Sequence, residues 1–452
     1  ILWSLGVALV VALVQLANLY ILPRLYPAFH AGLSSLALAL AALGWAVWFP
    51  SPSTSQSDGA SRRWTLGRWT FSRAAAGIAV AVGMVAVAAL ALVPGARSVS
   101  GFDNLRWILL EHAPTLRWGV RLAATVAPPP PNRCQDASCE ELPSVSAATP
   151  GGPTLDWSGR DIVLITVDAL RADRLGATRG GRPLTPELDA LAREGVVFEA
   201  AYAATPHTSY SLTSLMTGKY MRPLLLQGAG EDSDTWAGLL RTYGYRTAAF
   251  YPPAVFFIDT ARFRRFEESR LDFEYTKVEF AEGEKRLGQI RDYLAQQPPE
   301  QRLFLWLHLF GPHEPYEAQP GYDFGARDVD RYDSEVAFAD HTVGELVRMV
   351  RARSPRAVIV VTADHGEEFG EHGGRYHGTT VYEEQVRVPL VVVAPGDVVP
   401  GRVSRPVQTI DLLPTVLSAL GVPPQPRIRG RDLSPLLARR TPTEGAAAPD
   451  GS

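Results

Sequence analysis

The sequence predicts a large α/β domain, with helices packed around a mostly parallel sheet, preceded by an α-helical membrane region. Two observations predict the domain: short, continuous apolar runs begin at Asp161, and segments of helical periodicity separate them. Such alternation is typical of an α/β sandwich. A third observation, long uncharged apolar stretches before residue 94, predicts the membrane region.

Composition narrows the class of protein. At 452 residues the chain is too long for one small domain, and 46% hydrophobic residues excludes a disordered chain. The formal net charge of −3 gives no basic excess, so we expect no nucleic-acid partner. The two cysteines, Cys134 and Cys139, are too few for a disulfide scaffold or a four-thiolate zinc site.

Residues 1–94 are predicted to form a transmembrane region of three helices. The apolar stretches at 1–22, 31–49 and 74–93 each approach the length of about 20 residues that crosses a bilayer, and none contains a charged residue. The loop at 50–73 carries four arginines, whereas the loop at 23–30 carries only Arg24. Because arginine-rich loops stay in the cytoplasm, we expect a multi-pass membrane protein whose later part lies on the extracytoplasmic side, periplasmic or extracellular. The chain begins with Ile1, so the number of preceding spans stays open.

Residues 95–159 are predicted to connect the membrane region to the domain. The segment 103–126 suits a helix lying in the membrane interface or, equally well, an amphipathic helix packed on the domain. A linker rich in Pro, Ser and Gly follows it. Its two cysteines either close a small disulfide in an oxidising compartment or stay free thiols. Residues 441–452 are predicted to be a disordered tail.

Six apolar runs predict the strands of the domain, which we place at 160–440. They occupy 161–167, 196–202, 245–251, 302–310, 357–363 and 388–394. Segments of helical periodicity lie at 185–195, 233–244 and 333–353, and the first two end in Gly, as helices often do.

Acidic and imidazole side chains follow three of these runs. Asp168 follows the first run, His313 lies just beyond the fourth, and Asp364 and His365 follow the fifth. In open α/β sheets, ligands bind outside the carboxyl ends of the strands. We therefore expect these side chains to form one site.

The histidines are concentrated in the same part of the chain. Of the 9 histidines, those in 308–377 are His308, His313, His341, His365, His372 and His377. A uniform distribution would place about 1.4 there. Carboxylates and imidazoles without cysteine suit a divalent ion such as Zn²⁺ or Mn²⁺.

The segment ATPHTSYSLTSLMTGKY at 204–220 places hydroxyl groups at the start of a predicted helix, where main-chain N–H groups and the helix dipole favour an anion. This segment resembles the sulfatase and alkaline-phosphatase superfamily, and the resemblance implies an alkaline-phosphatase-like α/β/α sandwich. Counting back from Thr217 and Gly218 places the family nucleophile on Thr208. Soluble sulfatases have Cys or Ser there and convert it to formylglycine, which is impossible for Thr. A Thr nucleophile is similar to the membrane-anchored phosphoethanolamine transferases and lipoteichoic-acid synthases of the superfamily.

The resemblance also implies roles for other residues. Asp168, Asp364 and His365 match the metal ligands, together with Thr208. Ala169 stands where calcium-dependent members have a second Asp, and His365 where a calcium site more usually has Asn, so Zn or Mn is expected rather than Ca. His313 and His377 match the histidines that contact the transferred group or the leaving group.

Several neighbouring residues have two readings each. Arg171 either binds an oxygen of the substrate or forms an ordinary ion pair. His308 is equally well a core residue or a ligand. The charged and polar residues that follow His365 either belong to a solvated turn or contact the site. These residues are Glu367, Glu368, Glu371 and His372.

We therefore expect a membrane-anchored, metal-dependent enzyme that cleaves or transfers a phosphate-ester group through Thr208, acting on an envelope lipid or glycan. Thr208, His313 and His377 are the expected catalytic residues. The first alternative is a sulfuric ester hydrolase, and the second is a non-catalytic binding protein of the same fold. The choice of donor and acceptor, the number of metals and the oligomeric state stay open.

Overall fold

The computed structural model describes residues 155–438, apart from 227, 229 and 258, together with short stretches between residues 6 and 125. The chain divides into two units, 1–131 and 132–452. In the first unit, β1 (Trp64–Leu66) and β2 (Trp69–Phe71) form an antiparallel pair. No helix within the described residues is long and apolar enough to span a bilayer. The three expected spans lie largely outside those residues, as do Cys134, Cys139 and the tail, so these expectations stay predictions.

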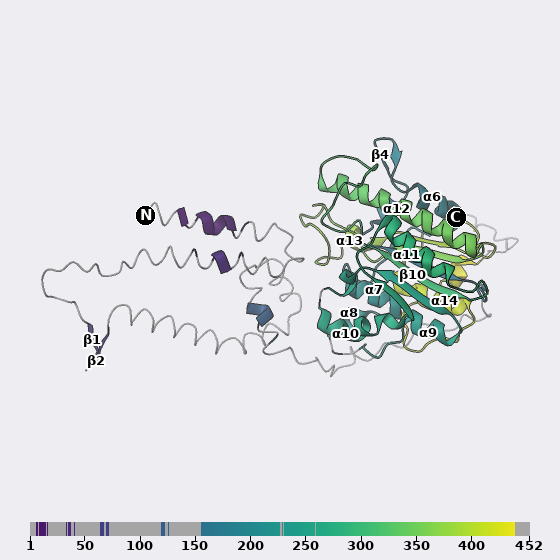
Figure 1. The fold of residues 1–452 in the computed structure, drawn as a ribbon, viewed down its shortest axis with the longest axis horizontal. Helices are drawn as coiled ribbons and strands as arrows, with labels where there is room; N and C mark the ends of the chain where they lie inside the picture. Colours follow the sequence, from purple (N-terminus) through teal and green to yellow (C-terminus); the bar gives the residue numbers. More distant parts are fainter. Residues whose placement is uncertain are drawn as a thin grey trace, which may run out of the picture. The chain divides into compact units, whose positions relative to one another are not determined.

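The second unit is built on an eight-stranded sheet in the order β14-β6-β13-β11-β3-β10-β8-β9 (Figure 1). All neighbouring pairs are parallel except those that β13 makes with β11 and β6. The mostly parallel sheet expected from the apolar runs is therefore confirmed. The strands are β3 Ile162–Val167, β6 Val196–Phe198, β8 Arg246–Tyr251, β9 Tyr275–Val278, β10 Leu303–Leu309, β11 Val358–Ala363, β13 Leu390–Val393 and β14 Gly401–Val403.

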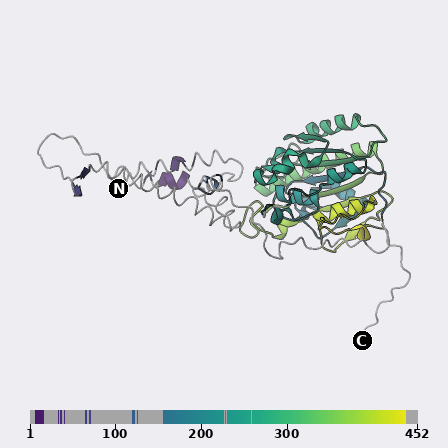
Figure 2. The same ribbon diagram turned by 90° about the horizontal axis from the view of Figure 1, so that it is seen from below.

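Helices cover both faces of this sheet (Figures 1 and 2). On one side α12 packs against α6 and α11, and on the other α7 packs against α8 and α14. The α-helices are α6 Pro186–Glu194, α7 Thr208–Thr217, α8 Met221–Leu226, α9 Trp236–Thr242, α10 Thr260–Glu268, α11 Gly283–Ala295, α12 Asp328–Arg353, α13 Glu383–Val386, α14 Leu412–Ala419 and α15 Ser434–Leu437. Short 3₁₀ helices are η2 Ala172–Arg174, η3 Pro253–Phe256, η4 Arg270–Asp272 and η5 Thr409–Asp411.

Two elements differ from the sequence-based expectation. The run at 196–202 breaks after β6, and its end forms β7 (Ala201–Tyr202) in a separate sheet with β12 (Arg387–Val388) and β15 (Val407–Gln408). The predicted helix at 333–353 begins earlier, at Asp328, because the Asp330 carboxylate accepts a hydrogen bond from the Arg327 N–H and caps the first turn. The remaining small sheet is the hairpin of β4 (Thr178–Arg179) and β5 (Arg182–Pro183).

The central strands are buried on both faces, which is why they read as continuous apolar runs. In β10, Phe304, Trp306 and His308 share one face, because side chains alternate along a strand. Phe304 and Trp306 stack in the core with Phe273, at ring-centroid distances of 5.4 and 5.8 Å. His308 continues this row at the carboxyl end of β10, where the ring of Trp306 lies 6.0 Å away. The core packing therefore fixes the direction of His308.

Candidate active site

The acidic and imidazole residues meet at the carboxyl ends of three adjacent strands. Because β11, β3 and β10 are parallel neighbours in register, Asp168, Asp364 and His308 arrive at the same sheet edge. His308 Nε2 lies 3.5 Å from Asp168 Oδ2. His365 Nε2 lies 3.5 Å from Asp168 Oδ1 and 3.3 Å from Asp364 Oδ2. The expected cluster exists, and His308 is part of it.

Thr208 reaches this cluster from the first residue of α7. Its Oγ1 lies 3.0 Å from His365 Nε2, and both residues are buried. His365 Nδ1 lies 2.9 Å from the Gly366 carbonyl oxygen. A carbonyl only accepts, so Nδ1 carries the proton and Nε2 presents a lone pair to the Thr208 hydroxyl. The Gly366 carbonyl thereby sets the tautomer that a metal-ligating histidine needs.

Helix α7 holds Thr208 in place. Residues 208–217 are all buried, and Ser211 Oγ donates a hydrogen bond to the Asp364 carbonyl oxygen. The helix ends at Gly218, whose φ of 66° is a left-handed conformation that glycine adopts without strain. The Gly218 carbonyl then accepts a hydrogen bond from the Arg429 N–H, at 2.8 Å. Both ends of the helix are thus tied to segments distant in sequence.

The carboxylates fit a divalent cation. Within residues 155–438, Asp168 Oδ1 and Oδ2 and Asp364 Oδ2 are buried and accept no hydrogen bond. Burial, followed by the nearby charge of Asp364, raises the pKa of Asp168 well above its ordinary value. Buried carboxylates are otherwise paired or bound to metals. Asp168, Asp364 and His308 have ligand atoms within 4.8 Å of one another, and His365 Nε2 faces both carboxylates. This set of oxygen and imidazole donors suits Zn²⁺ or Mn²⁺.

His313 and His377 lie beside the cluster. The ring of His377 stacks on that of His365 with centroids 4.1 Å apart, and the ring of His313 lies 4.9 Å from that of His377. His313 Nδ1 donates to the Glu314 carbonyl oxygen at 2.7 Å, and His377 Nδ1 lies 3.0 Å from Glu367 Oε1. In each ring, Nδ1 is the nitrogen for which the structure gives these contacts.

The histidines of the site have different proton affinities. Burial lowers the pKa of His365 and of His308 to about 4, so both rings are neutral and able to bind a cation near pH 7. Burial also opposes the charged form of His313, but the carboxylates of Glu314, Asp168 and Glu367 outweigh it and raise its pKa to about 9. His313 therefore carries a proton at neutral pH.

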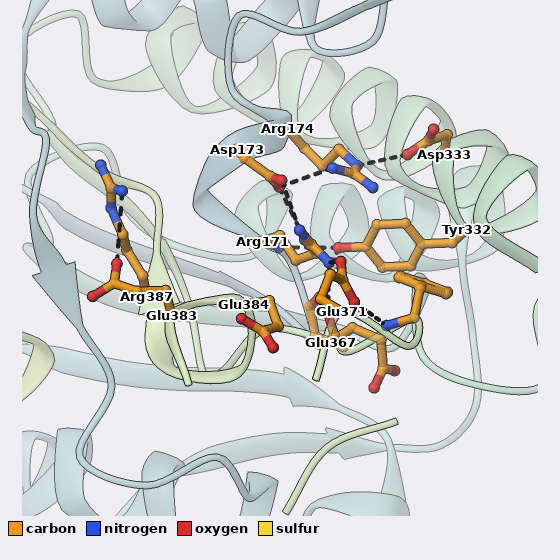
Figure 3. A network of polar contacts seen from close by, with 12 residues as sticks. Arg171, Asp173, Arg174, Tyr332, Asp333, Glu367, Glu371, Glu383, Glu384 and Arg387 are labelled. Atoms are coloured by element: carbon orange, nitrogen blue, oxygen red, sulfur yellow. Dashed lines mark hydrogen bonds and ion pairs between the residues drawn. The ribbon is translucent and has the colours of Figure 1, made fainter. Parts of the chain in front are cut away.

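Arg171 lies in a network of polar contacts with Asp173, Glu371 and Tyr332 (Figure 3). Its Nε and Nη2 donate to the two oxygens of Asp173, at 3.0 and 2.8 Å, and its Nη1 donates to Glu371 Oε1 and the Glu367 carbonyl oxygen. Its main-chain N–H donates to the Tyr332 hydroxyl, at 3.0 Å. The structure thus shows the ion pairs that sequence reasoning weighed against a substrate contact. A role in substrate binding stays a prediction.

Sequence reasoning missed Glu314 and gave Glu367 little weight. Both side chains are buried, and Glu314 Oε2 lies 3.3 Å from His313 Nδ1 and 3.8 Å from His377 Nδ1. The adjacency of Glu314 to His313 was the available signal for it. Nothing in the order of residues distinguished buried Glu367 from exposed Glu371 in the same turn.

The comparisons with known proteins agree with this architecture. An ulvan-active sulfatase from Formosa agariphila is 26% identical over 340 residues, which cover 62% of this chain and 66% of that protein. The N-acetylgalactosamine-6-sulfatase of Sus scrofa is 26% identical over 354 residues, covering 63% of this chain and 67% of that one. The chain thus spans about two thirds of the length of these relatives.

Two solved structures share the fold. The phosphonate monoester hydrolase of Agrobacterium radiobacter matches with a TM-score of 0.52 and 19% identity, covering 62% of this chain and 77% of that one. The lipoteichoic acid synthase LtaP of Listeria monocytogenes matches with a TM-score of 0.51 and 18% identity, covering 65% and 79%. The family model named Sulfatase matches residues 160–422. The chain therefore belongs to the sulfatase family.

Proposed function

We propose that this protein is a metal-dependent enzyme that cleaves or transfers a phosphate-ester group, with Thr208 as the nucleophile. The observation that carries the proposal is the position of the Thr208 hydroxyl. It lies at the start of α7, 3.0 Å from His365 Nε2, in the cluster that contains the Asp168 carboxylate, whose oxygens accept no hydrogen bond within the described part of the domain. Main-chain N–H groups at the start of a helix also favour the negative charge of the transferred group.

The ligands of the proposed metal are Asp168, Asp364, His365 and Thr208. When bound, a Zn²⁺ or Mn²⁺ ion supplies Lewis-acid charge that favours the alkoxide form of Thr208 and stabilises the oxygens of the transferred group. His308 is a further candidate ligand, because its Nε2 lies 3.5 Å from Asp168 Oδ2 and within the same group of donor atoms.

Thr208 loses its hydroxyl proton to solvent, attacks the phosphorus atom and forms a covalent phosphothreonine while the bond to the leaving oxygen breaks. His313 donates its proton to that oxygen, because its pKa of about 9 keeps it charged at neutral pH. His377, held by Glu367, orients the oxygens of the transferred group. Attack by water on the phosphothreonine breaks its bond to the Thr208 oxygen, returns a proton to His313 and completes a hydrolysis. Attack by another hydroxyl in the same way completes a transfer.

Hydrolysis of sulfate esters is the second candidate. The observation that favours it is that the curated relatives described above are sulfatases. Thr208 would then attack sulfur through the same cluster, without the formylglycine that a Cys or Ser precursor provides. We rank it second because that aldehyde cannot form on threonine.

We further propose that the amino-terminal apolar stretches hold the enzyme at a membrane, with the catalytic domain on the extracytoplasmic side. An envelope lipid or glycan is then the substrate. This proposal rests on the sequence of residues 1–94 and its arginine distribution alone.

The test is a parallel assay of the full chain, loaded with Zn²⁺ or Mn²⁺, on 4-nitrophenyl phosphate, bis(4-nitrophenyl) phosphate and 4-nitrophenyl sulfate. The proposal expects a phosphate ester to be turned over fastest and Thr208→Ala to be inactive. Thr213→Ala is the matched control, because Thr213 is buried in the same helix and its hydroxyl has no hydrogen-bond partner within residues 155–438. Preference for the sulfate ester would promote the second candidate, and undiminished turnover by Thr208→Ala would refute the nucleophile.

A further inference from the structure

A series of rings leads from the buried site to the surface. The ring of His377 lies between those of His365 and His313. The ring of His313 stacks on Phe310 with centroids 4.8 Å apart and planes at 21°. Phe310 in turn meets the edge of Phe280, with centroids 5.3 Å apart. His365 is fully buried whereas Phe280 is 57% exposed, so the series connects the buried site with the surface of the domain.

Phe280 lies at the same edge of the sheet as the site, the edge at which the parallel strands have their carboxyl ends. It follows β9, an edge strand that runs parallel to β8, and the pairing continues to Glu279, whose N–H donates to the Tyr251 carbonyl oxygen at 3.2 Å. The carboxyl end of β9 therefore opens on the same edge as those of β3, β10 and β11.

The loop that carries Phe280 is held from both sides. Glu282 Oε1 accepts a hydrogen bond from the Gly311 N–H, at 2.9 Å, which ties the loop to the turn of His313. The guanidinium of Arg286 is 1% exposed and donates to three carbonyl oxygens along the loop, those of Lys277, Glu279 and Ala281. Single exposed apolar side chains are common and need no explanation. Phe280 differs because the buried guanidinium of Arg286 fixes its main chain, and because its ring continues a series of ring contacts that ends at His365.

We infer that Phe280 and Phe310 form a subsite for the alcohol part of the ester and select alcohols that carry a ring next to the reacting oxygen. This inference rests on the proposed function. His313 donates its proton to the leaving oxygen, so the group attached to that oxygen lies beside the ring stacked on His313. Two phenylalanines offer a flat apolar face and no hydrogen bond, which suits the C–H face of a pyranose or an aromatic ring.

The test compares two primary alcohols of similar reactivity, one with a ring and one without. Glucose 6-phosphate and ethyl phosphate, with the corresponding sulfates, are offered to the full metal-loaded chain, and 4-nitrophenyl phosphate serves as the aromatic arm. We expect Phe280→Ala to lower the preference for the ring ester over the ethyl ester, in kcat/KM, by about tenfold. Phe280→Tyr keeps the face of the ring and should keep the preference. The matched control is Tyr243→Ala, which removes an exposed aromatic side chain that precedes β8, at the opposite edge of the sheet.

A second measurement does not depend on turnover. In the Thr208→Ala chain, saturation-transfer NMR should show contact between the ring hydrogens of the ester and the protein, and Phe280→Ala should weaken it. A wild-type chain that turns over esters with a preference unaffected by Phe280→Ala overturns this inference alone. A correctly folded, metal-loaded wild-type chain that turns over none of the esters overturns the proposed function. A loss of preference only for the aromatic arm would assign the subsite to aryl rather than sugar rings.

Discussion

Replacing Asp168 with Asn should separate two effects of this carboxylate on stability: its buried charge destabilises the metal-free fold, and its role as a ligand lets bound metal stabilise it. The Asp168 carboxylate is buried, faces Asp364 and accepts no hydrogen bond within residues 155–438. Burial and then Asp364 raise its pKa in the folded state. A carboxylate whose pKa is raised by folding destabilises the fold at pH values above its unfolded pKa. The neutral Asn removes that penalty, so metal-free Asp168→Asn should be at least as stable at pH 7 as the metal-free wild type.

Metal binding should reverse this order. At a free metal concentration of about 100 times Kd, binding stabilises the wild type by about 2.7 kcal/mol. Loss of a residue that hydrogen-bonds to a ligand already weakens metal binding by about 10- to 100-fold, so loss of a ligand itself should weaken it at least about 100-fold. The same metal concentration then equals the Kd of the variant, and the stabilisation falls to about 0.4 kcal/mol. For a domain of this size, these values correspond to rises in Tm of about 5–10 °C and about 1 °C.

Thermal unfolding of the full chain, after chelation and again with Zn²⁺ or Mn²⁺, measures both effects. Asp232→Asn is the control, since Asp232 is an exposed carboxylate paired with Arg427, and it should keep the full shift. An unchanged metal-dependent shift in Asp168→Asn would show that Asp168 is not a ligand. A metal-free variant clearly less stable than the wild type would show that the Asp168 carboxylate has a stabilising partner even in the absence of metal.

Further predictions concern Thr208, His313, Glu367 and Arg171. Thr208→Ser keeps a hydroxyl and should stay within about tenfold of the wild-type kcat, whereas Thr208→Ala should lose at least about a thousandfold in steady-state assays. The pKa of His313 is raised to about 9, so kcat should fall as pH rises through a value at or below about 9, and His313→Gln should abolish that limb of the pH profile. Glu367→Gln should lower kcat more than it raises KM, because it loosens His377; equal effects on both would argue for a merely structural role. Arg171→Lys loses the two-point contact with Asp173 and should cost about 1–2 kcal/mol in urea unfolding, whereas a fall in kcat/KM without a loss of stability would reassign Arg171 to substrate binding.

The sequence predicted those parts of the fold that depend on local pattern. Strands buried on both faces read as apolar runs, and β3, β10 and β11 begin and end within two residues of the predicted limits. The meeting of Asp168, Asp364 and His365 followed from the rule that parallel strands end at one edge. The sequence alone therefore predicted that these three residues lie close together.

Other parts depend on tertiary contacts that no local pattern encodes. The run at 196–202 divides between two sheets because β7 finds partners in β12 and β15, about two hundred residues away. The sequence left open whether His308 is a core residue or a metal ligand, because a buried histidine on a strand gives the same sequence pattern in both cases. Nothing in the sequence around Phe280 indicated that it lies near the site. Its position depends on the pairing of β9 with β8 and on the hydrogen bond between Glu282 and Gly311.

The central claim is that the Thr208 oxygen forms the covalent bond to the transferred group. Its most direct test is peptide mass spectrometry of the metal-loaded chain, quenched with acid during turnover of 4-nitrophenyl phosphate. The account predicts one phosphoryl group on the peptide that contains Thr208, and none in the Thr208→Ala chain. A phosphoryl group on any other residue would contradict it. So would rapid turnover by a wild type that carries no adduct when quenched, or rapid turnover by the Thr208→Ala chain.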